Sequence, residues 1–318
     1  MLFSRPPGER NLLLLPIERF LRDAQFYDSF LVALYASVGL GAATTMAFQS
    51  VFMVTMLAAE LPTAFFSDRW GKRHSLLLSA LLQIFAVALL YFCRDFWGIL
   101  VSEIIIGLSY AFSSGADTAL EFETLRALGR EKENLHRRSW NFAAGKGSLV
   151  LVMLLSAGII ALGGLWALVL AQLIIQIFRL AVTLFLCEPR VSERNRASLV
   201  AQEKESAFSI IGNFLFKNPS IRRVLPLAIV TWLGNWLVFW GRNLFLGELG
   251  FSEGAWGWLF AGVNAAALLA GLAVARWPAF FSSPKGALLA GFSPASRRYS
   301  GLPGWPAASF FLFPIPSG

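Results

Sequence analysis

Eight long apolar stretches constrain the fold of this chain more than any other feature of its sequence. A helix that crosses a membrane needs about 20 mainly apolar residues, and each stretch comes close to that length or exceeds it. They cover residues 12–37, 44–66, 75–92, 96–120, 142–162, 165–186, 224–245 and 254–275. A transmembrane β-barrel would instead show short segments of alternating polarity. The pattern predicts an all-α integral membrane protein with eight spans.

The balance of charged and apolar residues supports a lipid environment. Only 14% of the 318 residues are charged and 56% are hydrophobic, including 29 Phe and 11 Trp. A soluble domain usually has about a quarter of its residues charged. This chain has too few charged groups to cover a water-facing surface of its size, so we expect the lipid bilayer to be its solvent.

Few residues of the sequence are suited to metal binding or covalent catalysis. The two cysteines, Cys93 and Cys187, are too few for a disulfide framework, and the two histidines have no metal-site spacing. We therefore expect no metal and no cofactor. A membrane-embedded enzyme is disfavoured, because no nucleophile motif or His/Asp/Cys group faces a common site.

Lys and Arg alternate between the loops in a way that predicts the topology. Three loops contain neither residue: 39–43, 163–164 and 247–254. The loop at 70–74 is basic, 125–138 has five Lys and Arg, and 188–223 has seven. Cationic loops stay on the cytoplasmic side. We expect a multi-pass protein of the cell (plasma or inner) membrane with a cytoplasmic N-terminus. Topology accounts for the net charge of +8, so no nucleic-acid partner is expected.

The same pattern divides the chain into four parts. Residues 1–187 form a bundle of six spans, and the long polar segment 188–223 is expected to be a cytoplasmic linker. Residues 224–275 supply two further spans. The tail 276–318 holds half of the 14 prolines, and its Pro, Gly and Ser interrupt every apolar run before a span could form.

The charged loop after the second span carries a motif. The sequence "AFFSDRWGKR" at 64–73 resembles the loop G-x-x-x-D-R-x-G-R-R/K of the major facilitator superfamily, with Ala64 at the first glycine. The matching residues are Asp68, Arg69, Gly71, Lys72 and Arg73. "ELP" before the loop, "SSGADTAL" in the fourth span and "CEP" after the sixth also look like this family, so that the resemblance covers roughly residues 11–275.

The resemblance implies a helical bundle with a complete N-terminal six-helix half and two helices of the second half. It also implies transport of a small solute by alternating access, with the loop as a conformational latch. In such a latch Asp68 would face a helix of the second half, and Arg69 would pair with Asp117, Glu121 or Glu123. The alternative is that the basic residues only set the topology, but that does not explain Asp68 or Gly71.

Two departures from the family lead to a second hypothesis. The family usually has twelve spans and this chain has eight, and 142–162 lacks the Gly-Pro signature of proton antiporters. On this second hypothesis, the chain is a truncated or frameshifted permease that inserts in the membrane and does not transport a solute.

The fourth span provides the first candidate site residues. At about 100° per residue, Gly107, Tyr110, Ser114, Asp117 and Glu121 share one face with Glu103. An ionisable group within a membrane is costly and commonly functional, and the resemblance implies that spans one, four and seven border a central cavity. Glu103, Tyr110 and Asp117 are therefore candidates to line it. Asp117 could instead pair with arginines of a loop.

The first span adds Arg22, Asp23 and Tyr27 as cavity candidates. The alternative is a self-neutralised helix, since Glu18–Arg22 and Arg19–Asp23 are oppositely charged i,i+4 pairs. Asp23 and Glu103 are candidate proton carriers if transport is proton-coupled. The coupling ion, the solute and the oligomeric state stay open.

The seventh and sixth spans carry two more polar stripes. In the seventh, Asn235 and Arg242 are candidates to bind the solute, with Arg242 as an anchor for an anionic group; alternatively Arg242 reaches the outer interface. In the sixth, polar residues recur on one face, and we expect them to hydrogen-bond neighbouring helices. They are Gln172, Gln176, Arg179 and Thr183.

Overall fold

A computed structural model describes residues 6–189, 249–250 and 253–276. Within these residues the regular structure is entirely helical, and five helices are long and apolar enough to cross a membrane. They are α3 (Ala42–Trp70), α4 (Lys72–Phe92), the joined α5 and α6 (Phe96–Ala127), α7 (Asn134–Gly163) and α8 (Leu165–Leu184). An all-α protein compatible with a membrane is thus confirmed. The span predicted at 224–245, the tail and most of the linker lie outside the described residues.

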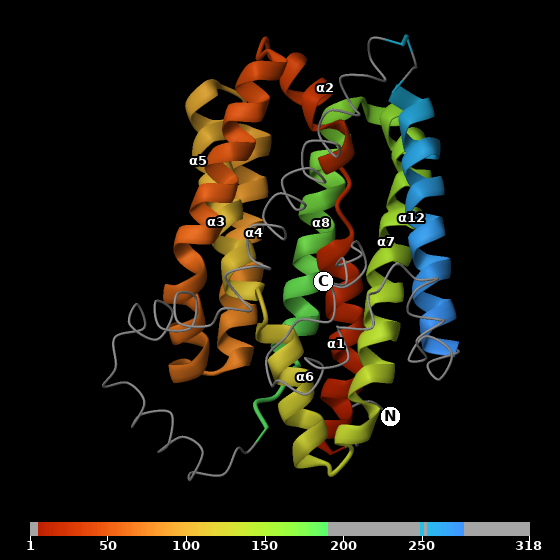
Figure 1. The fold of residues 1–318 in the computed structure, drawn as a ribbon. Helices are drawn as coiled ribbons and strands as arrows, with labels where there is room; N and C mark the ends of the chain where they lie inside the picture. The colour runs from red at the N-terminus through yellow and green to blue at the C-terminus, as the bar shows by residue number, and fades with distance from the viewer. Residues whose placement is uncertain (1–5, 190–248, 251–252, 277–318) are drawn as a thin grey trace, which may run out of the picture.

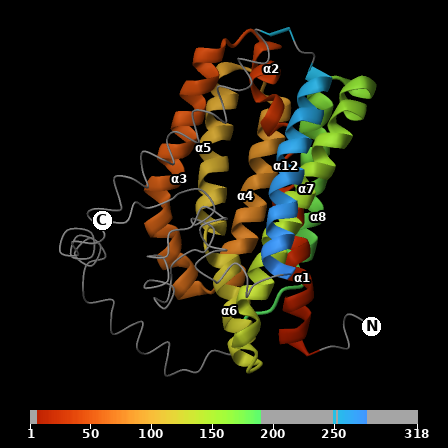
Figure 2. The same ribbon diagram turned by 45° about the vertical axis from the view of Figure 1, so that its right-hand side comes forward.

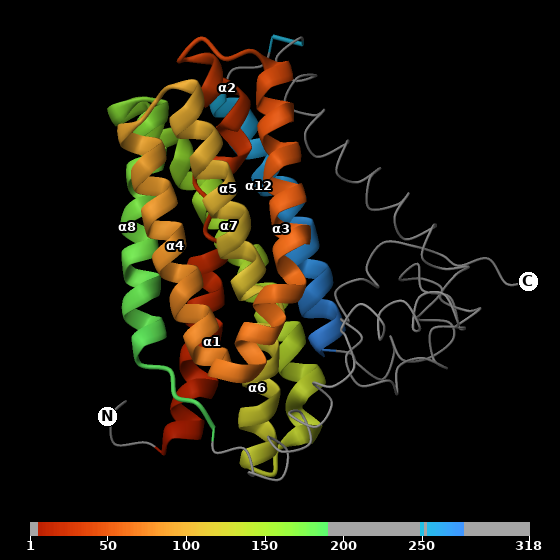
Figure 3. The same ribbon diagram turned by 90° about the vertical axis from the view of Figure 1, so that its left-hand side faces the viewer.

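The long helices run side by side along one common direction (Figure 1). α4 packs against α5 and α8, and α3 packs against α5; Figure 3 shows α4 beside α8. The eighth predicted span corresponds to α12 (Glu253–Arg276), which runs along α7 (Figure 2). A Cβ atom at Gly257 would lie 3.0 Å from the Met153 carbonyl oxygen, so this glycine permits the close approach of α12 to α7.

The outer surface of the bundle is rich in large apolar side chains. Leu162 is 92% exposed and Phe92 is 77% exposed, and many Leu, Phe and Trp side chains elsewhere on the helices are more than 40% exposed. Glu18, Glu103 and Arg179 are buried inside. A soluble monomer rarely exposes large contiguous apolar surface, whereas a lipid-facing surface requires it.

The first predicted span is not one continuous helix. α1 (Pro7–Asp23) ends before an irregular stretch, which is followed by the short helices η1 (Asp28–Phe30) and α2 (Leu31–Ala36). The Gln172 side-chain oxygen of α8 accepts the backbone N–H of Phe26 at 2.8 Å. A side chain from another helix therefore satisfies a backbone group that the break releases, as an apolar environment requires.

The fourth predicted span is also interrupted. α5 (Phe96–Ser113) and α6 (Ala116–Ala127) are separated by Gly115, whose φ of +72° is in the left-handed region. The expected polar stripe is therefore not continuous along one helix. Gly107 faces α3, since a Cβ atom there would lie 2.7 Å from the Phe52 carbonyl oxygen.

The basic loops and the loops without Lys or Arg lie at opposite ends of the bundle. The turn after α3, the segment with α6, η2 (Glu131–Glu133) and the start of α7, and the end of α8 all lie at the lower end of Figure 1. At the other end, the Trp166 indole N–H donates to the Ser37 hydroxyl at 3.2 Å, and the Arg94 guanidinium lies 4.3 Å from the centre of the Trp166 ring. The described loops thus alternate between the two ends as predicted, and Arg94 is the basic residue of the loop at 93–95, at the end with few charges.

Candidate functional site

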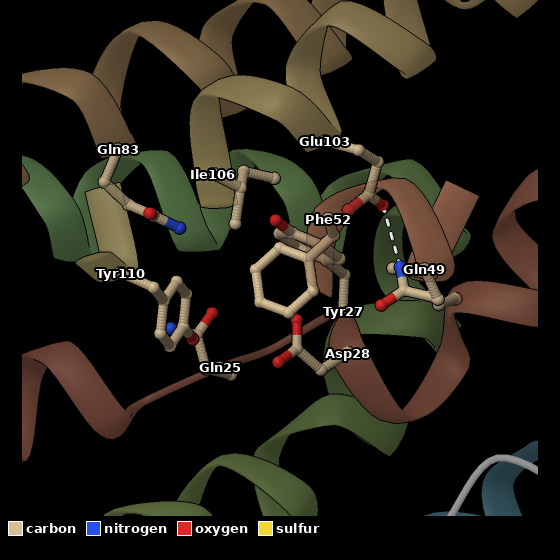
Figure 4. A pocket seen from close by; sticks show the side chains of 10 residues that line it. Gln25, Tyr27, Asp28, Gln49, Phe52, Gln83, Glu103, Ile106 and Tyr110 are labelled. Carbon is tan, nitrogen blue, oxygen red and sulfur yellow. Dashed lines mark hydrogen bonds between the residues drawn. The ribbon is translucent and has the colours of Figure 1, made fainter. Parts of the chain in front are cut away.

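A cavity of about 220 Å³ lies where the break between α1 and α2 meets α3, α4 and α5 (Figure 4). Its wall combines carboxylates, amides, aromatic rings and two aliphatic side chains. The lining residues are Gln25, Tyr27, Asp28, Leu31, Gln49, Phe52, Gln83, Glu103, Ile106 and Tyr110. The chain leaves the α-helical conformation between α1 and α2, so that the neighbouring residues Tyr27 and Asp28 both reach the cavity. In a continuous helix only every third or fourth residue would face it.

Glu103 of α5 is the most firmly held acid of the wall. One of its carboxylate oxygens accepts the Tyr35 hydroxyl of α2 at 2.6 Å and the Gln49 amide of α3 at 2.9 Å. Buried carboxylates need such donors, because burial without hydrogen bonds is costly. These two bonds connect three helices around one carboxylate and fix its position on the wall.

The structure brings only some of the predicted site residues together. Tyr27, Glu103 and Tyr110 line the cavity. Arg22, Asp23 and Asp117 lie outside the cavity wall and take part in ion pairs. The candidates Asn235 and Arg242 lie outside the described residues.

Several lining residues were not among the predicted ones. Gln49 and Gln83 are polar residues within long apolar stretches, and this was the signal that could have identified them. Gln25 and Asp28 reach the cavity because the first span breaks. On a continuous helix the adjacent residues Tyr27 and Asp28 would point about 100° apart, and both would not face one cavity.

A second layer of charged residues links α1 to α6. Both Arg19 and Arg22 bind the Asp117 carboxylate: the Arg19 Nε atom donates at 2.9 Å, and the Arg22 Nη2 atom lies 3.1 Å from Oδ2. The Arg22 Nε atom donates to Asp23 at 3.2 Å. Gly145 of α7 leaves room for Asp23, because a Cβ atom there would overlap the carboxylate. Thus Asp117 is neutralised by α1 and not by a loop.

A buried ion pair joins α1 to α8. The Arg179 Nε atom donates to Glu18 at 2.9 Å, and the Arg179 Nη2 atom donates to the Ser79 hydroxyl of α4 at 3.0 Å. The i,i+4 pair between Glu18 and Arg22 is not formed, because each residue pairs across helices. The prediction that the polar stripe of the sixth span bonds neighbouring helices is confirmed for Gln172 and Arg179, whereas the hydrogen bonds of Gln176 and Thr183 among the described residues join them to Arg179 within α8.

The motif loop after α3 is built around Gly71 and Glu188. Gly71 has a φ of +104°, and the Glu188 carboxylate accepts the backbone N–H groups of Lys72 at 2.8 Å and of Arg73 at 2.9 Å. Glu188 therefore caps the N-terminus of α4, where free N–H groups and the helix dipole favour an anion. It is the acid of the "CEP" sequence, and it ties the end of the sixth span to this loop.

The other charged residues of the loop behave differently from the expectation. Asp68 forms an ion pair with Lys72 one turn along. The Arg69 guanidinium lies 5.4 Å from the centre of the Trp70 ring, and no ion pair joins it to an acid of the described residues. Its expected partner Asp117 is occupied by α1, and Glu121 accepts the Asn141 amide at 2.6 Å. The expected ion pair of Arg69 with Asp117, Glu121 or Glu123 is not formed among the described residues, and this expectation was wrong.

The substitution Gly71→Ala is expected to lower the thermal stability of the protein more than Gly39→Ala. Both positions have a left-handed φ, which costs a residue with a Cβ atom about 1–3 kcal/mol. At Gly71 the new Cβ atom would also lie 2.9 Å from the Glu188 side chain, whereas nothing lies within 4 Å at Gly39. Unfolding midpoints in detergent compare the two variants. Equal losses would contradict the role of Glu188.

The part of the chain that the structure describes contains no group of three or more His, Cys, Asp or Glu side chains that could hold a metal ion. Cys93 is a free, exposed thiol, and Cys187 is a free thiol that is half-buried. No family model matches the sequence, and no curated protein is significantly similar to it.

Proposed function

We propose that the protein is a secondary active transporter of the major facilitator type, which moves a small solute across the membrane by alternating access of two bundles. The observation that carries the proposal is the cavity among the helices, whose wall holds Asp28, Glu103 and three glutamines. Polar and ionisable groups inside a membrane bundle are costly and mark substrate or ion pathways.

The motif loop supports the choice of family. It lies at the basic end of the bundle and connects α3 to α4, as the resemblance of 64–73 to the superfamily implies. Asp68 and Lys72 form a local pair, and Glu188 fixes the start of α4. In the proposed mechanism this loop is the latch, and Asp68 meets a helix of the second half, which lies outside the described residues.

The ion pairs between α1 and α6 form a second closure in this proposal. Arg19 and Arg22 of α1 both bind the Asp117 carboxylate of α6, a helix that lies at the basic end of the bundle (Figure 1). Alternating access requires contacts of this kind to form and break in turn. The cavity opens to the basic side when Arg19 and Arg22 separate from Asp117.

We propose further that the chain resides in the cell (plasma or inner) membrane with its N-terminus in the cytoplasm. Cys93 lies in the loop between α4 and α5, at the end opposite the basic loops, and its thiol is exposed. A membrane-impermeant maleimide is expected to label Cys93 in intact cells and to fail with Cys93→Ser. Labelling that requires permeabilised cells would place this loop inside and reverse the topology.

Solute uptake into proteoliposomes tests the transport function. The purified full chain is reconstituted and offered labelled amines, amino acids, sugars and organic acids, with and without a proton gradient. We expect at least one solute to accumulate above protein-free liposomes, and Glu103→Gln to abolish this uptake. A folded protein that takes up no solute would favour the inserting but non-transporting permease. Uptake that survives Glu103→Gln and Asp28→Asn alike would contradict the cavity assignment, because these are the two carboxylates of the described wall.

A further inference from the structure

We propose that the cavity binds a small organic cation, an amine or ammonium compound with an apolar or aromatic portion. This inference rests on the proposed transport function for its physiological meaning. The binding step it concerns can still be measured without transport. Three independent properties of the wall carry it: charge, an unsatisfied amide and aromatic surface.

The wall holds two carboxyl groups and no basic side chain among its described residues. Asp28 and Glu103 line the cavity, and no Lys, Arg or His is among its described lining residues. The nearby arginines are engaged elsewhere: Arg22 with Asp117 and Asp23, and Arg179 with Glu18. The Asp28 carboxylate makes no hydrogen bond or ion pair with a described side chain. A ligand with a positive charge would supply the missing counter-charge inside a site of low dielectric.

Gln83 provides the second observation. Its side chain is 2% exposed, and neither amide atom has a hydrogen-bond partner among the described residues. Figure 4 shows this amide and the Asp28 and Glu103 carboxylates converging on the same space around the Phe52 ring. An unpaired buried amide costs free energy that a ligand recovers when it completes the bonds. An ammonium N–H donates to the Gln83 carbonyl oxygen as well as to the carboxylates.

The aromatic side chains make an organic cation a better fit than a metal ion. Tyr27, Phe52 and Tyr110 line the cavity, and the Phe52 and Tyr110 rings meet edge to face with their centres 5.5 Å apart. Aromatic faces attract ammonium groups and pack against apolar carbon. A hard metal ion prefers six or more oxygen ligands and gains nothing from these rings. The volume of about 220 Å³ is below that of most drug-binding pockets, which restricts the ligand to a small molecule.

Binding of three probes of similar shape to the full chain in detergent tests the inference. The probes are 2-phenylethylamine, which is a cation at pH 7, its neutral analogue 2-phenylethanol, and the anion phenylacetate. We expect calorimetry to show binding of the amine and at least tenfold weaker binding of the other two. Equal binding of the alcohol, stronger binding of phenylacetate, or no binding of the amine to folded protein would overturn the proposal.

Variants of the wall locate the binding site. Glu103→Gln and Asp28→Asn are each expected to weaken amine binding about tenfold, and Gln83→Leu is expected to weaken it several-fold. The matched control is Glu60→Gln, which neutralises an exposed carboxylate of α3 outside the cavity. Thermal unfolding of each variant identifies any that fails to fold, and the conclusion then rests on the others. Unchanged affinity in all three folded wall variants would overturn the site.

Failure of this inference can be distinguished from failure of the transport function. If the amine binds and the wall variants weaken it while no solute crosses the liposome membrane, the cation site stands and the transporter does not. If a neutral or anionic solute is transported and the amine does not bind, transport stands and the cation specificity is overturned.

Discussion

Replacing Arg179 by Met is expected to lower the free energy of unfolding by about 3–5 kcal/mol. Glu18 is 0% exposed and Arg179 is 1% exposed, and the Arg179 Nε atom donates to the Glu18 carboxylate at 2.9 Å. The substitution leaves this carboxylate in the interior without its counter-charge. It also removes the hydrogen bond that Arg179 of α8 donates to the Ser79 hydroxyl of α4.

Unfolding of the purified protein by a denaturing detergent, followed by tryptophan fluorescence, measures this loss. The double variant Glu18→Leu/Arg179→Met is the decisive control, because replacing both charges of a buried pair by apolar side chains is often neutral or stabilising. We expect the double variant to recover most of the stability. A double variant as unstable as Arg179→Met alone would show that the ion pair is not the cause.

Asp117→Asn is expected to have the second large effect, a loss of about 3 kcal/mol. Asp117 is the common partner of Arg19 and Arg22, so neutralising it leaves two guanidinium groups without their main acceptor. The estimate lies at the lower end of the range for buried pairs, because both arginine side chains are somewhat exposed, 17% and 15%. The same unfolding experiment measures it.

Asp68→Asn is the matched control for Asp117→Asn. It removes the same charge from an aspartate of an ion pair, but the Asp68 side chain is 50% exposed. Exposed pairs contribute at most about 1 kcal/mol, since water screens them. Equal losses for the two variants would mean that Asp117 is stabilised by water and not by α1.

The positions of the long helices could be predicted from the lengths of the apolar stretches. α3, α4, α8 and α12 follow the predicted spans within a few residues at most of their ends. α7 begins at Asn134, inside a segment predicted as a loop. Polar residues such as Arg137 and Arg138 can continue a helix beyond the apolar core, and hydropathy alone does not reveal where the helix begins.

The two helix breaks could not be predicted equally well. The break at Gly115 had a local signal, because "SSG" joins two serines to the residue that best adopts a positive φ. The break after Asp23 had no such signal. It depends on Gln172 of α8, which accepts the Phe26 N–H from 146 residues away. A contact of this kind is a property of the folded bundle and not of the local sequence.

Only part of the cavity wall could be predicted, because some of its residues lie on a regular helix and others reach it through the break in the first span. Glu103 and Tyr110 lie on the same face of the regular helix α5, and periodicity was enough to place them together. Asp28 is near them only because the first span unwinds. Asp117 follows the Gly115 break, so the helical period no longer relates it to Glu103. Its partners Arg19 and Arg22 bind Asp117 of α6, whereas the alternative interpretation paired Arg19 with Asp23 and Arg22 with Glu18 inside the first span.

The most direct test of the central claim is whether one residue of the cavity wall can be reached from both sides of the membrane. Gln83→Cys is prepared in a Cys93→Ser/Cys187→Ser background and treated with a membrane-impermeant cationic thiol reagent in right-side-out and inside-out vesicles. Val54→Cys is the control, because Val54 is 66% exposed on the outer surface of α3 and does not line the cavity. We predict that Gln83→Cys reacts in both vesicle types and Val54→Cys in neither. Reaction of Gln83→Cys from one side only, or from neither, would contradict alternating access around this cavity.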